Sequence, residues 1–134
     1  DAMGHVRFFL FYLACGTVAV LAQALPAPDS TIPMIGASGA ISGVLGAYLL
    51  LYPHARVLVL VPLGVLTQLV QLPALLVLGL WFGLQLVSSV LADADAPGVA
   101  FGAHAGGFVA GLVLVSIFKR RGVRMWQSRR PRRP

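Results

Sequence analysis

Four long stretches without a charged side chain dominate this 134-residue sequence. They cover residues 8–25, 36–52, 74–92 and 99–118. A helix needs about 20 mostly apolar residues to cross the hydrocarbon core of a bilayer, and each stretch has about that length. We therefore predict an all-α membrane protein, a polytopic bundle of transmembrane helices with four spans in this chain.

The composition excludes most other classes of protein. Hydrophobic residues make up 58% of the chain and charged residues only 10%, whereas about a quarter of a soluble domain is charged. A disordered chain or an ordinary soluble domain does not have this balance. The single cysteine, Cys15, excludes an internal disulfide. We therefore expect a lipid bilayer to surround most of the chain.

The remaining apolar stretch, residues 57–72, is a weaker candidate for a span. Pro62, Gly64, Gln68 and Gln71 interrupt it, and it shows no alternation of polar and apolar residues typical of a strand. We interpret it as an interfacial or re-entrant segment.

The positions of the charges predict the orientation. Short loops rich in Lys and Arg stay cytoplasmic. With four spans, all ten basic residues fall on one side: Arg7 precedes the first span, Arg56 follows the second, and the rest lie in residues 119–134. Three of the four acidic residues lie in the opposite loops, namely Asp29, Asp93 and Asp95. We therefore expect residues 119–134 to be a basic, disordered cytoplasmic tail.

The net charge of +6 does not indicate a nucleic-acid partner, because the basic residues gather in the tail and no soluble surface presents them. We expect the tail to fix the orientation and to contact anionic headgroups. The preference for Arg over Lys and the abundance of Ala, Gly and Val favour a GC-rich bacterial genome, and for a membrane protein with this orientation we expect the bacterial inner membrane.

Two polar side chains inside the predicted spans are candidates for function, because burying a polar group in lipid is unfavourable. Ser38 lies in the sequence GASG at the outer end of the second span, and His104 lies in AHAGG in the outer half of the last span. Two other interpretations stay open. The serine could bond a carbonyl of its own helix, and the histidine could be a structural donor between helices.

Small residues accompany both candidates at the spacing that lets helices approach closely in lipid. Gly39 and Gly43 follow the serine, and Gly107 and Gly111 follow the histidine. Packing these two stripes together would bring the hydroxyl to the imidazole, as a serine nucleophile and its general base require. Gly36 and Gly39 would give the backbone freedom to present the serine and an amide to an oxyanion.

The stretches GASGAISGVLGAYLLLYPHARV, from residue 36, and AHAGGFVAGLVL, from residue 103, resemble the rhomboid intramembrane serine proteases. The resemblance implies an endopeptidase that cleaves single-span membrane proteins in or near their transmembrane segments. It implies a catalytic dyad of Ser38 and His104, with no cofactor and no metal.

The resemblance also implies what this chain lacks. Residues 1–118 would form part of a peptidase domain, their four spans matching the third to sixth helices of a six-helix core. The second helix of the family carries a His and an Asn that help to hold the oxyanion, and nothing in this chain matches them. Several relatives have a Tyr at the position of Ser42 that stacks on the catalytic histidine, so we expect the ring of His104 to be less firmly oriented.

Two other classes of function remain as alternatives. A non-catalytic rhomboid-like protein would bind client helices without cutting them, but such proteins usually lack one of the two dyad residues. A transporter fragment would suit helices interrupted by glycine, but no acidic residue or Lys lies at the bilayer midplane to bind a coupling ion. The sequence leaves the oligomeric state open.

Overall fold

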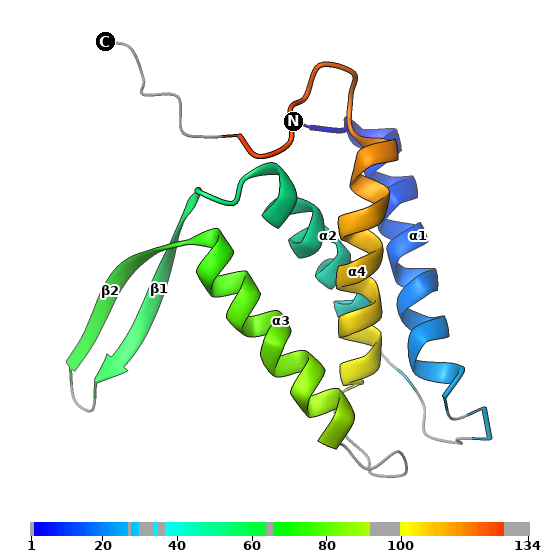
Figure 1. Ribbon diagram of the computed structural model, residues 1–134, viewed down its shortest axis with the longest axis horizontal. Coiled ribbons are helices and arrows are strands. Elements are labelled where there is room, and N and C mark those ends of the chain that lie inside the picture. Colours follow the sequence, from blue (N-terminus) through cyan, green and yellow to red (C-terminus); the bar gives the residue numbers. More distant parts are fainter. Residues whose placement is uncertain are drawn as a thin grey trace.

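The computed structural model describes residues 2–26, 28–29, 34, 37–63, 66–91 and 100–127. This part of the chain contains four helices and one β-hairpin (Figure 1). The helices are α1 (His5–Ala24), α2 (Ser38–Leu51), α3 (Ala74–Leu91) and α4 (Phe101–Phe118). The strands are β1 (Arg56–Leu63) and β2 (Leu66–Pro73). The chain is thus mainly helical, as the sequence predicts, and each helix lies where a span is expected.

Only three of these four helices have the length of a membrane span. α1, α3 and α4 are long and apolar enough to cross a bilayer. α2 has 14 residues and is therefore about 21 Å long, whereas the hydrocarbon core is about 30 Å thick. Half of its residues are buried in the bundle, so α2 is a shorter apolar helix enclosed by the other helices.

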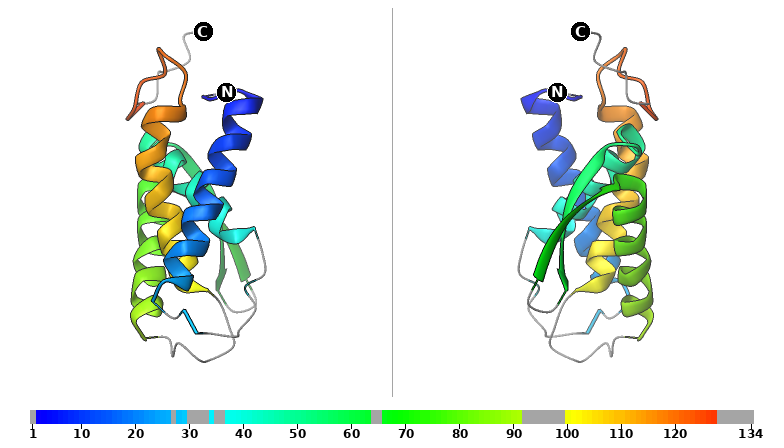
Figure 2. Two further views of the ribbon diagram at one scale, coloured as in Figure 1. Left: turned by 90° about the vertical axis from the view of Figure 1, so that its right-hand side faces the viewer. Right: turned by 90° about the vertical axis from the view of Figure 1, so that its left-hand side faces the viewer.

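α4 makes the most extensive contacts in the bundle and packs against all three other helices (Figures 1 and 2). Its most extensive contacts are with α2 and α1, and its contact with α3 is smaller. Gly39 of α2 lies against Gly107 of α4, and Gly43, further along α2, lies against Gly111, further along α4. These two helices are therefore parallel. Their N-terminal ends therefore lie at the same end of the bundle, and Ser38 and His104 both occur there.

Glycines allow the close approach of α2 and α4. A Cβ atom on Gly107 would overlap the carbonyl oxygen of Gly39, and one on Gly111 would overlap the carbonyl oxygen of Gly43. A Cβ atom on Gly43 would lie 2.5 Å from the Cβ atom of Cys15 on α1. The two backbones thus touch along the predicted stripes, with α1 closing the third side.

The beginning of the basic tail is folded, contrary to our expectation of disorder. The Arg120 amide donates to the carbonyl of Ala2 at 2.9 Å, and the Trp126 amide donates to that of Leu50 at 2.9 Å. Residues 119–127 therefore return to the ends of α1 and α2 and cover them. Residues 128–134 lie outside the described part of the chain.

Residues 57–63 and 66–72 pair as two antiparallel strands, so our interpretation that this segment lacks a strand pattern is wrong. β1 pairs with β2 from Arg56 opposite Pro73 to Leu63 opposite Leu66. Alternation is invisible in the sequence because both faces of β1 are apolar, while the β-branched valines favour a strand. The open edges of a two-stranded sheet are incompatible with the hydrocarbon core, so an interfacial position stays our prediction.

Candidate active site

The structure brings Ser38 and His104 together. His104 Nε2 lies 2.8 Å from Ser38 Oγ, which is hydrogen-bonding distance. Ser38 is exposed and His104 is partly buried, so the hydroxyl is accessible while the ring is held between helices. The local alternative, a bond from a serine to its own helix, applies to Ser42, whose Oγ donates to the carbonyl of Ser38 at 2.8 Å.

Ser38 is the first residue of α2, and the amide of Ile41 donates to the carbonyl of Ala37, the residue before the helix. The first amides of a helix, here those of Ser38, Gly39 and Ala40, have no acceptor within the helix itself. Such amides, together with the helix dipole, favour a negative charge at this end. The start of α2 thus combines a hydroxyl with amide donors.

Of the two glycines predicted to position the backbone at Ser38, Gly36 and Gly39, the structure describes only Gly39. Gly36 lies outside the described residues. Gly39 is buried, and a Cβ atom there would lie 2.6 Å from the Cβ atom of Ala19 and 3.4 Å from the carbonyl oxygen of Ala103. The absence of a side chain at Gly39 therefore lets α1 and α4 approach α2 beside Ser38.

A glutamine from α1 binds the first turn of α4, just before His104. Gln23 Oε1 accepts a hydrogen bond from the Ala103 amide at 3.1 Å. No side chain of α4 itself caps this end, since its N-cap residue is Ala100. Gln23 therefore takes the role of an N-cap residue and fixes the first turn of α4 relative to α1.

We expect Gln23→Met, which keeps the length of the side chain, to lower the free energy of unfolding by about 1 kcal/mol, because the Ala103 amide loses its acceptor. Unfolding of the purified protein in detergent micelles measures this difference. Gln68→Met makes the same chemical change on the exposed part of β2 and serves as the control. Equal stability of the two variants would contradict the capping role.

Two residues of α3, Gln85 and Trp81, contact the imidazole ring of His104. Gln85 Oε1 lies 2.9 Å from His104 Nδ1. The ring of Trp81 lies 6.1 Å from that of His104, centroid to centroid, at an angle of 35°. We expected a less firmly oriented ring because Ser42 replaces an aromatic residue on α2, but α3 supplies both an aromatic ring and a hydrogen bond in its place.

Gln23 and Gln85 are not among the functional residues predicted from the sequence. Both are polar residues inside uncharged stretches, which is the same signal that singled out Ser38 and His104. Gln23 lies on α1 and Gln85 on α3, whereas the residues that they contact lie on α4. No local pattern in the sequence links either glutamine to α4.

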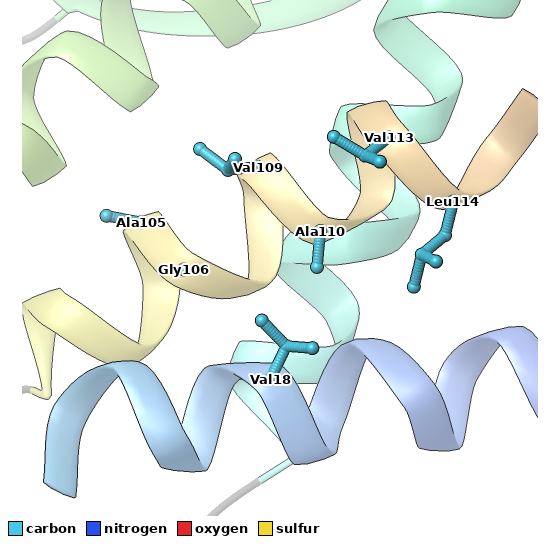
Figure 3. Close-up of a pocket in the computed structure, with 7 residues that line it drawn as sticks. All are labelled: Val18, Ala105, Gly106, Val109, Ala110, Val113 and Leu114. Carbon is cyan, nitrogen blue, oxygen red and sulfur yellow. The ribbon is translucent and has the colours of Figure 1, made fainter. Parts of the chain in front are cut away.

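An apolar groove of about 520 Å³ lies between α1 and α4 (Figure 3). Its lining consists of Val18 of α1 and of six residues of α4, namely Ala105, Gly106, Val109, Ala110, Val113 and Leu114. Neither Ser38 nor His104 belongs to its lining, and no lining side chain is polar. The groove therefore offers no group for chemistry.

A comparison of the sequence with known protein families identifies one family of membrane proteins. The family described as Rhomboid domain matches residues 1–121, which include every helix described above. No curated protein and no solved structure matches the chain. Because the family match covers most of the sequence, this chain, an integral membrane protein, belongs to the rhomboid family.

Proposed function

We propose that the protein is an intramembrane serine endopeptidase that uses Ser38 as the nucleophile and His104 as the general base. The rhomboid family suggests this class of protease. The observation that carries the proposal is the distance of 2.8 Å between Ser38 Oγ and His104 Nε2 at the start of α2. A hydroxyl hydrogen-bonded to an imidazole is the arrangement that activates a serine.

In the proposed reaction, Ser38 Oγ attacks the carbonyl carbon of the substrate while His104 Nε2 takes the hydroxyl proton. The negative charge that develops on the carbonyl oxygen would be stabilised by the amides at the start of α2, including that of Gly39. His104 then gives its proton to the leaving amine, and an acyl-enzyme remains. Attack by water on this ester, with His104 again as base, would release the second product.

The shortness of α2 supports a reaction below the membrane surface. Because α2 is about 9 Å shorter than the hydrocarbon core is thick, its first residue can lie inside the membrane and still be near one surface. Ser38 is exposed there, which water needs for the second step. We propose that this surface is the outer face of a bacterial inner membrane, with the C-terminal tail in the cytoplasm.

The proposed substrates are single-span membrane proteins that unwind near the outer end of their helix. A peptide bond inside a helix is inaccessible to a nucleophile, and unwinding in lipid frees backbone groups that need new partners. Residues that weaken helices lower this barrier, because glycine is about 1 kcal/mol less favourable than alanine in a helix. The substrate therefore contributes part of the selectivity.

We expect a single-span reporter with two glycines near the outer end of its helix to be cut about tenfold faster than one with two leucines. The measurement is quantitation and terminal sequencing of the fragments formed by the complete gene product in membranes. Placing the glycines near the cytoplasmic end is the control and should leave the rate unchanged. Stable binding of the intact reporters without cleavage would instead support a non-catalytic protein that binds client helices.

A further inference from the structure

One face of α3 is directed at the imidazole of His104. Trp81 and Gln85 are four residues apart and thus lie on the same side of the helix. The ring of Trp81 packs against that of His104, and also lies 6.0 Å from the ring of Phe108 one turn further along α4. Phe82 stacks on Phe108 at 4.4 Å. These contacts fix where the side chain of Gln85 meets α4.

The two nitrogens of His104 have different partners. Nδ1 lies 2.9 Å from Gln85 Oε1, and Nε2 lies 2.8 Å from Ser38 Oγ. An amide oxygen can only accept a hydrogen bond, so Nδ1 must carry a proton to bond it. A neutral imidazole has one protonated nitrogen, so Nε2 then holds the lone pair that faces the serine hydroxyl.

This tautomer is the one that a general base requires. If the proton were on Nε2 instead, the ring would donate a hydrogen bond to Ser38 Oγ and could not take its proton. We propose that Gln85 is a positioning residue that selects the Nδ1-protonated tautomer of His104 and orients the ring toward Ser38. This inference rests on the function proposed above, because it assigns a role to Gln85 in the same reaction.

The surroundings strengthen this selection. Gln85 is only partly exposed and lies within a helix that is long and apolar enough to span the membrane. A hydrogen bond between partly buried groups is stronger than the same bond in bulk water, because the local dielectric constant is lower. When His104 takes the proton of Ser38, both ring nitrogens carry hydrogen, and Gln85 Oε1 still accepts the bond from Nδ1. The neutral amide thus takes the place of the acidic third residue of a serine protease triad.

Three variants test the proposal by kinetics. Gln85→Met keeps the shape of the side chain and removes the acceptor, and we expect it to lower kcat about 10- to 100-fold with KM unchanged. Gln85→Glu keeps an acceptor at the same reach and should recover most of the rate. Gln68→Met on β2 is the matched control and should behave as wild type. Equal kcat in wild type and Gln85→Met, or a loss in Gln85→Glu as large as in Gln85→Met, would overturn the proposal.

A spectroscopic measurement tests the same proposal without relying on activity. The ¹⁵N NMR signals of labelled histidine distinguish the two tautomers, and the signals of His104 are those lost in His104→Ala. We expect the Nδ1-protonated form in wild type and in Ser38→Ala, and an increase of the Nε2-protonated form in Gln85→Met. The Nε2-protonated form in wild type would overturn the proposal. Cleavage that survives Ser38→Ala would instead overturn the proposed function, while the tautomer would still report on Gln85.

Discussion

Ser38→Ala is expected to reduce cleavage of a membrane-anchored reporter by about 10⁴-fold or more, because removing the nucleophile of a serine protease leaves only the contribution of substrate binding and oxyanion stabilisation. The expected loss is in kcat, since the hydroxyl does not hold the substrate. His104→Ala should cause a loss of similar size, because nucleophile and base act as a unit. The measurement is the rate of fragment formation in membranes that contain equal amounts of folded protein.

Ser116→Ala is the matched control for this experiment. Ser116 is also an exposed serine of the bundle, but its hydroxyl donates to the carbonyl of Val113 within α4. It lies three turns beyond His104, so the variant should cleave at the wild-type rate. Retained cleavage in Ser38→Ala, with Ser116→Ala unchanged, would contradict the assignment of the nucleophile.

The second large effect is expected at the contact between α2 and α4. A Cβ atom on Gly111 would overlap the carbonyl oxygen of Gly43 and would lie 2.6 Å from its carbonyl carbon. These are backbone atoms, so the helices must separate to accommodate even a methyl group. We expect Gly111→Ala to lower the free energy of unfolding by about 3 kcal/mol. Unfolding of the purified protein in mixed micelles measures this loss.

α3 offers a matched control for the same substitution. A Cβ atom at Gly79 or at Gly83 would have no neighbour within 4 Å. Because alanine favours a helix more than glycine does, Gly83→Ala should be as stable as wild type or more stable by up to about 1 kcal/mol. If Gly111→Ala and Gly83→Ala proved equally stable, the close contact between α2 and α4 would not be what holds the bundle together.

The sequence predicts the helices well because hydrophobicity and the absence of charge define a helix in lipid almost by themselves. The expected segment 74–92 corresponds to α3, which spans Ala74–Leu91, and 99–118 corresponds to α4, which spans Phe101–Phe118. The expected segment 36–52 corresponds to α2, which spans Ser38–Leu51 and is the shortest of the four helices.

The hairpin escaped prediction for a local reason. Val57 to Val61 alternate Val and Leu, so both faces of β1 are apolar and no polar period marks a strand. Proline and glycine near residues 62–64 do mark a turn, and a short apolar run next to turn residues is compatible with a strand.

The proximity of Ser38 and His104 can be predicted from the sequence because the same spacing of small residues occurs on two helices. The contacts of the imidazole with α3 cannot be predicted in this way. Gln85 and Trp81 reach His104 through the rotation of α3 about its axis, which is fixed by the packing of Phe82 on Phe108. A pattern along one chain segment carries no information about such a rotation.

The most direct test of the central claim, that Ser38 is a nucleophile activated by His104, is covalent labelling by a fluorophosphonate. The reagent forms a bond between phosphorus and an activated serine oxygen, and fluoride leaves. The measurement is labelling of the protein in membranes, with the modified residue identified by mass spectrometry. Our account predicts a label on Ser38 that disappears in Ser38→Ala and in His104→Ala. A folded protein that remains unlabelled at Ser38, or that is labelled equally in His104→Ala, would contradict it.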